Sequence, residues 1–244
     1  MKRFYESRIP GPESRHLIVI QNDPEVPAGT YAGYLMEEGV PFRIVKPFAG
    51  EELPHSAELS AVIVLGGAMG VHDTERYPFL SDIKAFIRDV VGECIPFLGI
   101  CLGGQLLADA LGARVTADSG FGEKGTLPVT LTPEGTTDPL FTGIDREFIT
   151  FQWHNDSFEV PAGGVRLAES KACPNQAFRC GKNAWGLQFH PEVDRTIVDV
   201  WARWTEATSP RADQFLASFT RAEESYRIAS RRLLANFLRI ARLA

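Results

Sequence analysis

Short apolar runs alternate with helical patterns through the first hundred residues, and this alternation constrains the fold more than any other feature. Four runs have the character of buried strands: His16–Gln21, Phe42–Lys46, Ala61–Leu65 and Ile95–Ile100. Two segments between them are interpreted as helices, Gly29–Glu38 and Tyr77–Gly92. Strands that alternate with helices pair in parallel and carry helices on both faces of the sheet. The sequence therefore predicts a doubly wound, mostly parallel α/β fold.

The pattern changes after Gly112, where short β-type segments follow one another with few helical stretches between them. These segments are Leu127–Leu131, Phe148–Trp153, Val165–Ala168, Ala177–Arg179 and Gly186–Phe189. Short strands without intervening helices favour antiparallel pairing. We expect a small antiparallel sheet along the edge of the parallel one.

The last fifty residues have a helical pattern. Ser209-Pro210 predicts an N-cap and a first-turn proline, after which apolar residues recur three or four apart as far as Ile240. We expect these helices, at 195–244, to pack on a single domain at 16–194, with a contact between subunits of a homo-oligomer as the alternative. Residues 1–15, rich in charge, proline and glycine, are interpreted as a flexible N-terminal extension.

Composition limits the classes of partner. The chain has 244 residues, of which 44% are apolar, enough for one large core. The net charge of −6 and the lack of a run of basic residues disfavour nucleic acid and anionic membranes. We find neither the pattern of a signal peptide nor an apolar run of the ~20 residues that a membrane helix needs. The expected location is cytoplasmic.

Cysteine usage points to reduced thiols. Four cysteines, at 94, 101, 173 and 180, are too few for a disulfide scaffold, and they lack the close pairing expected of a zinc site. We interpret Cys94, Cys173 and Cys180 as small, partly buried side chains and expect no metal.

Cys101 differs because of its neighbours, Gly99-Ile100-Cys101-Leu102-Gly103-Gly104-Gln105. Small residues on both sides of a nucleophile, between a strand and a helix, are typical of a nucleophile elbow, in which a sharp turn lifts the side chain above the sheet. The following helix, from Gly103 to about Leu111, directs its positive dipole end towards the sulfur and favours the thiolate. Cys101 is therefore the predicted nucleophile.

A thiolate nucleophile needs a base, and two histidines have an acid two residues away. His190 precedes Glu192 in GLQFHPE, and His154 precedes Asp156 in WHND. In extended chain, residues i and i+2 project to the same side, so either acid can orient its imidazole. Spacing alone leaves both pairs open.

Five motifs together resemble those of class I glutamine amidotransferases, in order and in spacing. They are GICLGGQLLA around Cys101, LGGAMG at 65–70, FQWHND at 151–156, NQAFR at 175–179 and GLQFHPE at 186–192. The resemblance spans about Leu17 to Glu192 and is most similar to stand-alone GMP-synthase-like amidotransferase domains. It implies a flavodoxin-like fold and assigns the base to His190, oriented by Glu192.

The resemblance also implies the rest of the site. An oxyanion needs N–H donors; Leu102 can offer one from the start of the helix, and the family pattern places the second at Gly67. Gln105 corresponds to a glutamine that holds the substrate. Asp156 matches a substrate-binding acid of the family, although Asn155 stands where the family has glycine.

The implied reaction is cysteine-dependent hydrolysis of the γ-amide of glutamine through a γ-glutamyl thioester, without a metal or an organic cofactor. No segment of the chain is interpreted as a synthase, so the ammonia would pass to a separate acceptor protein. Two alternatives stay open: a γ-glutamyl peptidase or hydrolase acting alone, and a non-catalytic binding or regulatory protein on this scaffold.

Overall fold

The computed structural model describes residues 16–244, so the expected extension at 1–15 lies outside the described residues. The strands are β1 (His16–Ile20), β2 (Phe42–Val45), β3 (Leu59–Val64), β4 (Phe97–Ile100), β5 (Val115–Thr116), β6 (Glu123–Leu131), β7 (Glu147–His154), β8 (Ser157–Phe158), β9 (Val165–Glu169), β10 (Ala177–Cys180) and β11 (Ala184–Leu187). The α-helices are α1 (Gly29–Glu37), α2 (Phe79–Gly92), α3 (Leu102–Ala110), α4 (Pro133–Thr137), α5 (Arg195–Arg203) and α6 (Ala212–Ile240).

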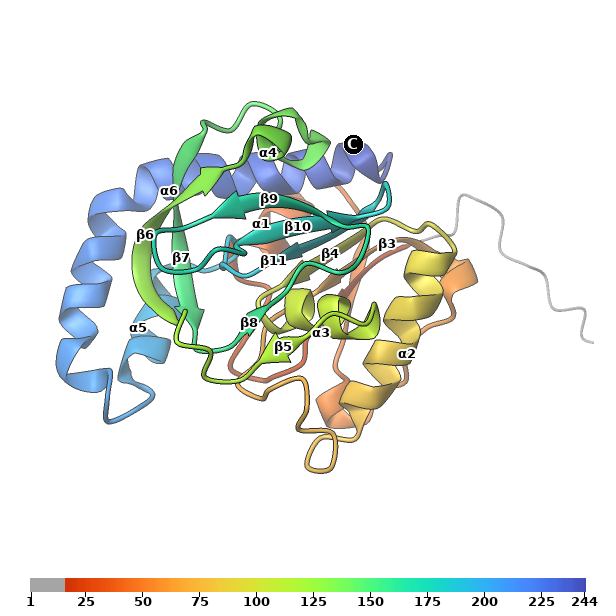
Figure 1. Ribbon diagram of the computed structural model, residues 1–244, viewed down its shortest axis with the longest axis horizontal. Coiled ribbons are helices and arrows are strands. Elements are labelled where there is room, and N and C mark those ends of the chain that lie inside the picture. The colour runs from red at the N-terminus through yellow and green to blue at the C-terminus, as the bar shows by residue number, and fades with distance from the viewer. Residues whose placement is uncertain (1–15) are drawn as a thin grey trace, which may run out of the picture.

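Within residues 16–244, nine strands form one sheet in the order β2-β1-β3-β4-β11-β10-β9-β6-β7 (Figure 1). The first five strands of this order pair in parallel. The other four continue the sheet through antiparallel pairs. A separate antiparallel pair joins β5 to β8. The predicted fold class, a mostly parallel α/β sheet with antiparallel strands at its edge, is confirmed.

The apolar residues of the parallel strands are divided between two cores, one on each face of the sheet. In β1, Leu17 and Val19 pack with α1 and α6, whereas Ile18 and Ile20 pack with α2 and α3. This period of two places successive side chains on opposite faces of a strand that is buried on both sides. Figure 1 shows α2 and α3 in front of the sheet and α1 behind it.

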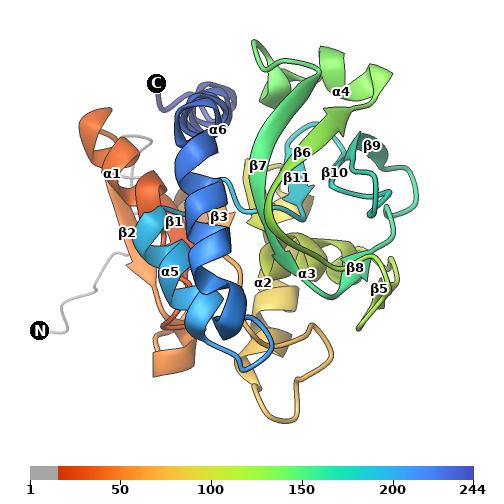
Figure 2. The ribbon, with the colours of Figure 1, turned by 90° about the vertical axis from the view of Figure 1, so that its left-hand side faces the viewer.

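The C-terminal residues form α5 and the 29-residue α6. Figure 2 shows α5 lying beside the first part of α6, which then continues across the molecule. The start of α6 differs from the prediction: Ser209 is the first residue of a short 3-10 turn, Ser209–Arg211, and the N-cap of that turn is Thr208. The α-helix begins only at Ala212, because the turn around Pro210 comes first.

Two further features concern the surface. Cys94 is exposed rather than partly buried, because it lies beyond the end of α2 in a turn with a φ of 58°. Cys173 and Cys180 are buried. None of the helices in the described part of the chain combines the length and the apolar character needed to cross a bilayer.

Candidate active site

Cys101 lies in a strained turn between β4 and α3. Its φ of 49° and ψ of −109° are unfavourable for a residue with a side chain. The turn is held by a hydrogen bond from the Cys101 N–H to the Leu187 carbonyl oxygen, at 2.8 Å. A Cβ at Gly103 would overlap the carbonyl oxygen of Val64, and one at Gly104 would lie 2.6 Å from that of Leu187. Only glycines therefore allow α3 to start so close to β3 and β11.

His190 and Glu192 follow β11, the strand that pairs in parallel with β4. The N–H of His190 donates to the Phe151 carbonyl oxygen at 2.8 Å, which attaches this segment to β7. The imidazole Nδ1 lies 2.8 Å from Glu192 Oε1, and both side chains are buried. A carboxylate in this position holds the Nδ1 proton and leaves Nε2 for a reacting group.

The structure brings Cys101 and His190 together over Gly66, at the end of β3. A Cβ built on Gly66 would lie 3.0 Å from His190 Cε1 and 3.6 Å from the Cys101 Cβ. Burial by itself would lower the pKa of His190. The Glu192 carboxylate and a hydrogen bond with Cys101 raise the pKa by more than burial lowers it, so the pKa rises from 6.5 to about 10. The imidazole is therefore stabilised as imidazolium beside the sulfur.

The two residues predicted to supply oxyanion donors, Gly67 and Leu102, are in contact. A Cβ built on Gly67 would come within 2.8 Å of Leu102 Cδ2, so the loop after β3 packs directly on the start of α3. Neither the Gly67 N–H nor the Leu102 N–H has a hydrogen-bond acceptor within residues 16–244. Two unpaired N–H groups beside a buried thiol can stabilise negative charge on a substrate oxygen.

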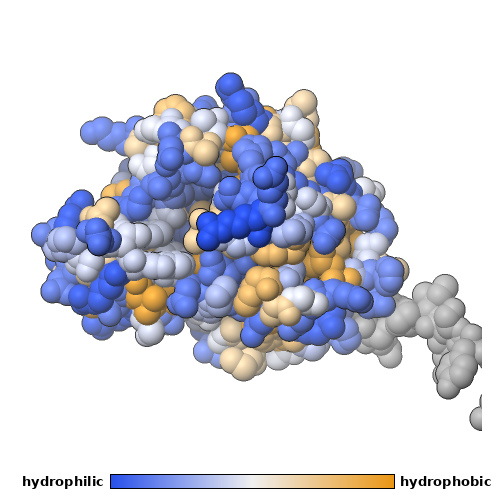
Figure 3. All heavy atoms as spheres, turned by 90° about the horizontal axis from the view of Figure 1, so that it is seen from below, coloured by the Kyte–Doolittle hydropathy of each residue, from blue (hydrophilic) through white to orange (hydrophobic). Residues whose placement is uncertain are grey.

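A cavity of about 530 Å³ opens above these groups. Its lining includes Cys101, His190, Gly67, Gln105 and Asp156, so these sequence-predicted residues meet in one site. The loop after β3 and the loop between α5 and α6 border it, and both lie at the lower edge of Figure 1. Figure 3 views that edge from below and shows a face dominated by hydrophilic residues with scattered apolar ones.

Gln105 and Asp156 occupy different parts of this cavity. Gln105 is buried, and its amide nitrogen lies 3.4 Å from Gln188 Oε1. Asp156 belongs to the rim, where Oδ1 accepts a hydrogen bond from the Asp118 N–H at 3.1 Å. The carboxylate thus remains close to the space above Cys101, where it can meet a polar substrate group.

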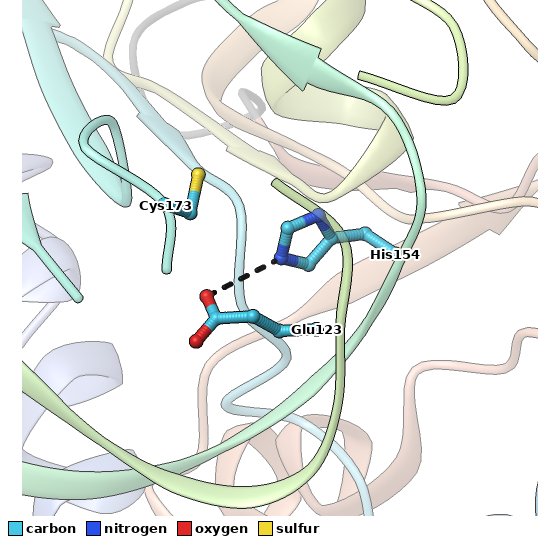
Figure 4. Close-up of side chains that lie close together, drawn as sticks. All are labelled: Glu123, His154 and Cys173. Carbon is cyan, nitrogen blue, oxygen red and sulfur yellow. Dashed lines mark ion pairs between the residues drawn. The ribbon is translucent and has the colours of Figure 1, made fainter. Parts of the chain in front are cut away.

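The two candidate imidazole–carboxylate pairs have different geometries. His154 Nδ1 lies 3.0 Å from the backbone oxygen of Asp156, and the Asp156 carboxylate bonds elsewhere. His154 Nε2 lies 3.8 Å from Glu123 Oε2 (Figure 4). Because His190 pairs with a side-chain carboxylate next to Cys101, it has the geometry expected of the base.

Several residues of the site were missed by the sequence reasoning. Gln188 Nε2 lies 3.8 Å from Cys101 Sγ, and its place in the GLQFHPE motif was the only signal along the chain. Lys124, Trp153 and Trp201 line the cavity from β6, β7 and α5. Trp153 stands in the FQWHND motif, whereas no sequence spacing relates Lys124 or Trp201 to the site, so only packing identifies those two.

The last helix holds the segment that contains His190 and Glu192. The Tyr226 hydroxyl lies 3.1 Å from the carbonyl oxygens of both His190 and Val193. The Ser230 hydroxyl donates to the Pro191 carbonyl oxygen. On the other side, the Thr30 N–H donates to the Glu192 carbonyl oxygen at 2.8 Å. Helices α1 and α6 therefore position the backbone of this segment.

Comparison with known proteins gives consistent results. A family model described as glutamine amidotransferase class-I matches residues 30–199. The glutamine amidotransferase-like protein YfeJ of Salmonella typhimurium is 35% identical over 177 residues, which cover 70% of this chain and 73% of that protein. One subunit of the glutamine-hydrolysing GMP synthase of Methanocaldococcus jannaschii is 33% identical over 148 residues, covering 60% of this chain and 71% of that protein.

The chain spans only 24% of the longer GMP synthase of Bacillus subtilis that it also matches. Among solved structures, a glutamine amidotransferase from Thermotoga maritima superposes with a TM-score of 0.83 at 30% identity, covering 93% of this chain and 98% of that one. The family match covers more than half of the chain, and relatives above 30% identity support it. The chain therefore belongs to the class I glutamine amidotransferase family.

Proposed function

We propose that this protein hydrolyses the side-chain amide of glutamine, with Cys101 as nucleophile, His190 as general acid and base, and Glu192 as the group that orients His190. The observation that carries the proposal is the convergence of a strained elbow cysteine and a buried imidazole–carboxylate pair at the base of one cavity. The names of its relatives support glutamine as the substrate.

The first half of the reaction forms an acyl-enzyme. The Cys101 thiolate attacks the amide carbon, and the resulting oxyanion accepts hydrogen bonds from the Gly67 and Leu102 N–H groups. As the C–N bond breaks, the His190 imidazolium donates a proton to the leaving nitrogen, which departs as ammonia. The products of this half are a γ-glutamyl thioester and a neutral imidazole.

The second half regenerates the enzyme. Neutral His190 accepts a proton from water, and the hydroxide attacks the thioester carbon. The C–S bond then breaks, which restores the thiolate beside the imidazolium and releases the γ-carboxylic acid, which loses its proton to solvent and becomes glutamate. Gln105 and Asp156 are placed to hold the substrate, because both line the cavity next to Cys101.

We further propose that the ammonia is consumed by a separate synthase. One relative of similar length is named as a subunit of a GMP synthase, which indicates that it works with another chain. By this analogy, the present chain supplies ammonia to a partner in the cytoplasm. No other part of the proposed mechanism depends on the identity of that partner.

A γ-glutamyl conjugate is the second candidate substrate, and the cavity favours it. A volume of about 530 Å³ lies within the range of sites for small organic molecules. Trp153 and Trp204 also line this space and offer apolar surface to a leaving group larger than ammonia.

The test is to measure release of ammonia and glutamate from L-glutamine by the purified protein, with a γ-glutamyl dipeptide assayed in parallel. Cys101→Ala should abolish turnover, whereas Cys94→Ala, which changes an exposed cysteine, should not. Preference for glutamine supports an amidotransferase, and preference for the dipeptide supports a hydrolase. Turnover that survives Cys101→Ala would refute the mechanism.

A further inference from the structure

A second cluster of ionisable side chains lies beside the active-site cavity. Glu123 begins β6, His154 ends β7, and Cys173 lies in the loop between β9 and β10 (Figure 4). All three are buried, and one carboxylate oxygen, one imidazole nitrogen and the sulfur lie within 4.8 Å of one another. Carboxylate, imidazole and thiolate are the groups with which proteins bind zinc.

His154 has an unpaired nitrogen that faces this cluster. Its Nδ1 lies 3.0 Å from the Asp156 carbonyl oxygen, which can only accept, so Nδ1 carries the proton of the neutral ring. Nε2 then presents a lone pair towards Glu123 Oε2 at 3.8 Å. The side chain is 1% exposed, and Nε2 has no hydrogen-bond partner in the described part of the chain. A buried acceptor that faces another acceptor is destabilising unless a proton or a metal ion lies between them.

Neighbouring side chains hold Glu123 in place. Oε2 accepts hydrogen bonds from the Ser170 hydroxyl at 2.7 Å and from Gln176 Nε2 at 2.6 Å. Gln176 is itself held by Gln152, whose Nε2 donates to Gln176 Oε1 at 2.9 Å. Hydrogen bonds of this kind orient the ligands of metal sites, as does the bond from His154 Nδ1 to a backbone carbonyl.

Cys173 completes the set of donors. The Cys173 N–H donates to the Ser170 hydroxyl at 3.0 Å, so the residue that orients Glu123 also holds the cysteine loop. The thiol donates to the Asn175 carbonyl oxygen at 3.7 Å, and a bound zinc ion would displace its proton.

We propose that Glu123, His154 and Cys173 bind a zinc ion. One carboxylate and one thiolate balance the two positive charges, so the buried site has no net charge. In a tetrahedral zinc site, nitrogen and oxygen ligands lie about 3.3 Å apart, so the observed 3.8 Å requires a small closure, and the sulfur, which lies within 4.8 Å of the other two atoms, must also move towards them. The mixed N, O and S donors favour zinc over magnesium or calcium. The fourth position is left for water.

The site joins three segments and supports the rim of the cavity. It ties β6 and β7 to the loop before β10, and Asn155 and Asp156, which follow His154, line the active-site cavity. The residue spacing 123, 154 and 173 resembles no zinc motif. The proposal departs from the sequence-based expectation of no metal, and it does not depend on the proposed reaction.

Zinc binding is tested in the full chain carrying Cys101→Ala, because Cys101 and His190 form a second thiol and imidazole pair that zinc could occupy. After removal of metal with a chelator, zinc is titrated against a chromophoric competitor. We expect one equivalent to bind and to raise the melting temperature by about 5 °C or more at a large excess over Kd. Cobalt in place of zinc should show thiolate-to-metal charge-transfer absorption.

Three substitutions, each added to the Cys101→Ala protein, locate the site. Cys173→Ser and the near-isosteric Glu123→Gln should each weaken zinc binding on the order of 100-fold or more. Cys180→Ser is the matched control, because Cys180 is also a buried cysteine and lies outside the cluster. Circular dichroism establishes that each variant is folded. The proposal is overturned if the Cys101→Ala protein binds no zinc, or if both cluster variants bind it as tightly as the control.

Discussion

Cys101 combines a φ of 49° with a buried position, and such strain persists only where the surrounding structure enforces it. The Cys101 N–H donates a hydrogen bond to the Leu187 carbonyl oxygen, and the glycines of α3 let the helix start close to the sheet; together they hold Cys101 in this conformation. His190 is also held in place, because its ring bonds to Glu192 and its backbone N–H donates to the Phe151 carbonyl oxygen. At the scale of single residues, the site is a set of side chains whose orientations are decided before substrate arrives.

The first prediction concerns Glu192. Replacing it with glutamine keeps the shape of the side chain but removes the charge that stabilises the His190 imidazolium and selects its tautomer. Glu192→Gln should lower kcat for glutamine by about 10³- to 10⁴-fold and lower the pKa of His190. Steady-state kinetics and NMR titration of the imidazole measure the two effects. Glu169→Gln, at a partly exposed position outside the site, should change neither; an unchanged kcat in Glu192→Gln would contradict the assigned role.

A second prediction concerns pH and stability. The pKa of His190 is about 10 in the folded protein, above the ordinary value of 6.5, so the folded state binds this proton more tightly than the unfolded state. The resulting stabilisation is complete below pH 6.5 and is lost as pH rises towards 10. Urea unfolding of wild type and His190→Gln across this range should give a stability difference that shrinks with increasing pH. A constant difference would show that the proton is not held this way.

At the scale of elements, helix α3 begins where two strands and a loop converge. Its first turn contacts the backbone of β3 through Gly103 and the backbone of β11 through Gly104. The side chain of Leu102, the first residue of this helix, packs against Gly67 in the loop after β3. The same chain segment therefore provides the nucleophile, a candidate oxyanion donor and the packing that joins β4 to its neighbours.

The third prediction compares two helical glycines. Gly103→Ala should destabilise the protein by about 1–3 kcal/mol or more, because the new methyl group would overlap the Val64 carbonyl oxygen. Gly33→Ala in α1, where the added methyl group would meet nothing within 4 Å, should stabilise it by about 0.5–1 kcal/mol. Urea denaturation measures both free energies of unfolding. Equal effects of the two substitutions would refute the packing argument.

At the scale of the whole molecule, one sheet separates two apolar cores, and the site lies at the carboxyl ends of its parallel strands. Helix α6 belongs to the core on the α1 face and also bonds to the segment that contains Glu192. The C-terminal helix therefore contributes both to stability and to the geometry of the site.

The fourth prediction tests that contribution. Phe237 in α6 is fully buried in the core that includes β1 and α1. Phe237→Ala should destabilise the protein by about 3–5 kcal/mol. Ile228→Ala in the same helix, at a side chain that is 59% exposed, should change the stability by less than about 0.5 kcal/mol. Thermal and urea unfolding measure both; a tolerated Phe237→Ala would mean that α6 is not part of this core.

The sequence by itself predicted the alternation of strands and helices, the elbow at Cys101 and the resemblance to the amidotransferase family. These features are local, because each depends on periodicity or on a few consecutive residues. The prediction was wrong where neighbouring preferences compete: the turn around Pro210 delays α6 until Ala212, and Cys94 lies in an exposed turn.

Only the tertiary structure decided which distant residues meet. The i, i+2 spacing was the same for His190 and His154, but the pairing of β11 with β4 carries His190 to Cys101. The position of His154 at the end of β7 places its ring near Glu123 and Cys173 instead. The support that Tyr226 gives to His190 likewise depends on how α6 crosses the molecule. Spacing along the chain determines only which residues within one segment point to the same side. Strand pairing and helix packing bring together residues that no sequence pattern connects.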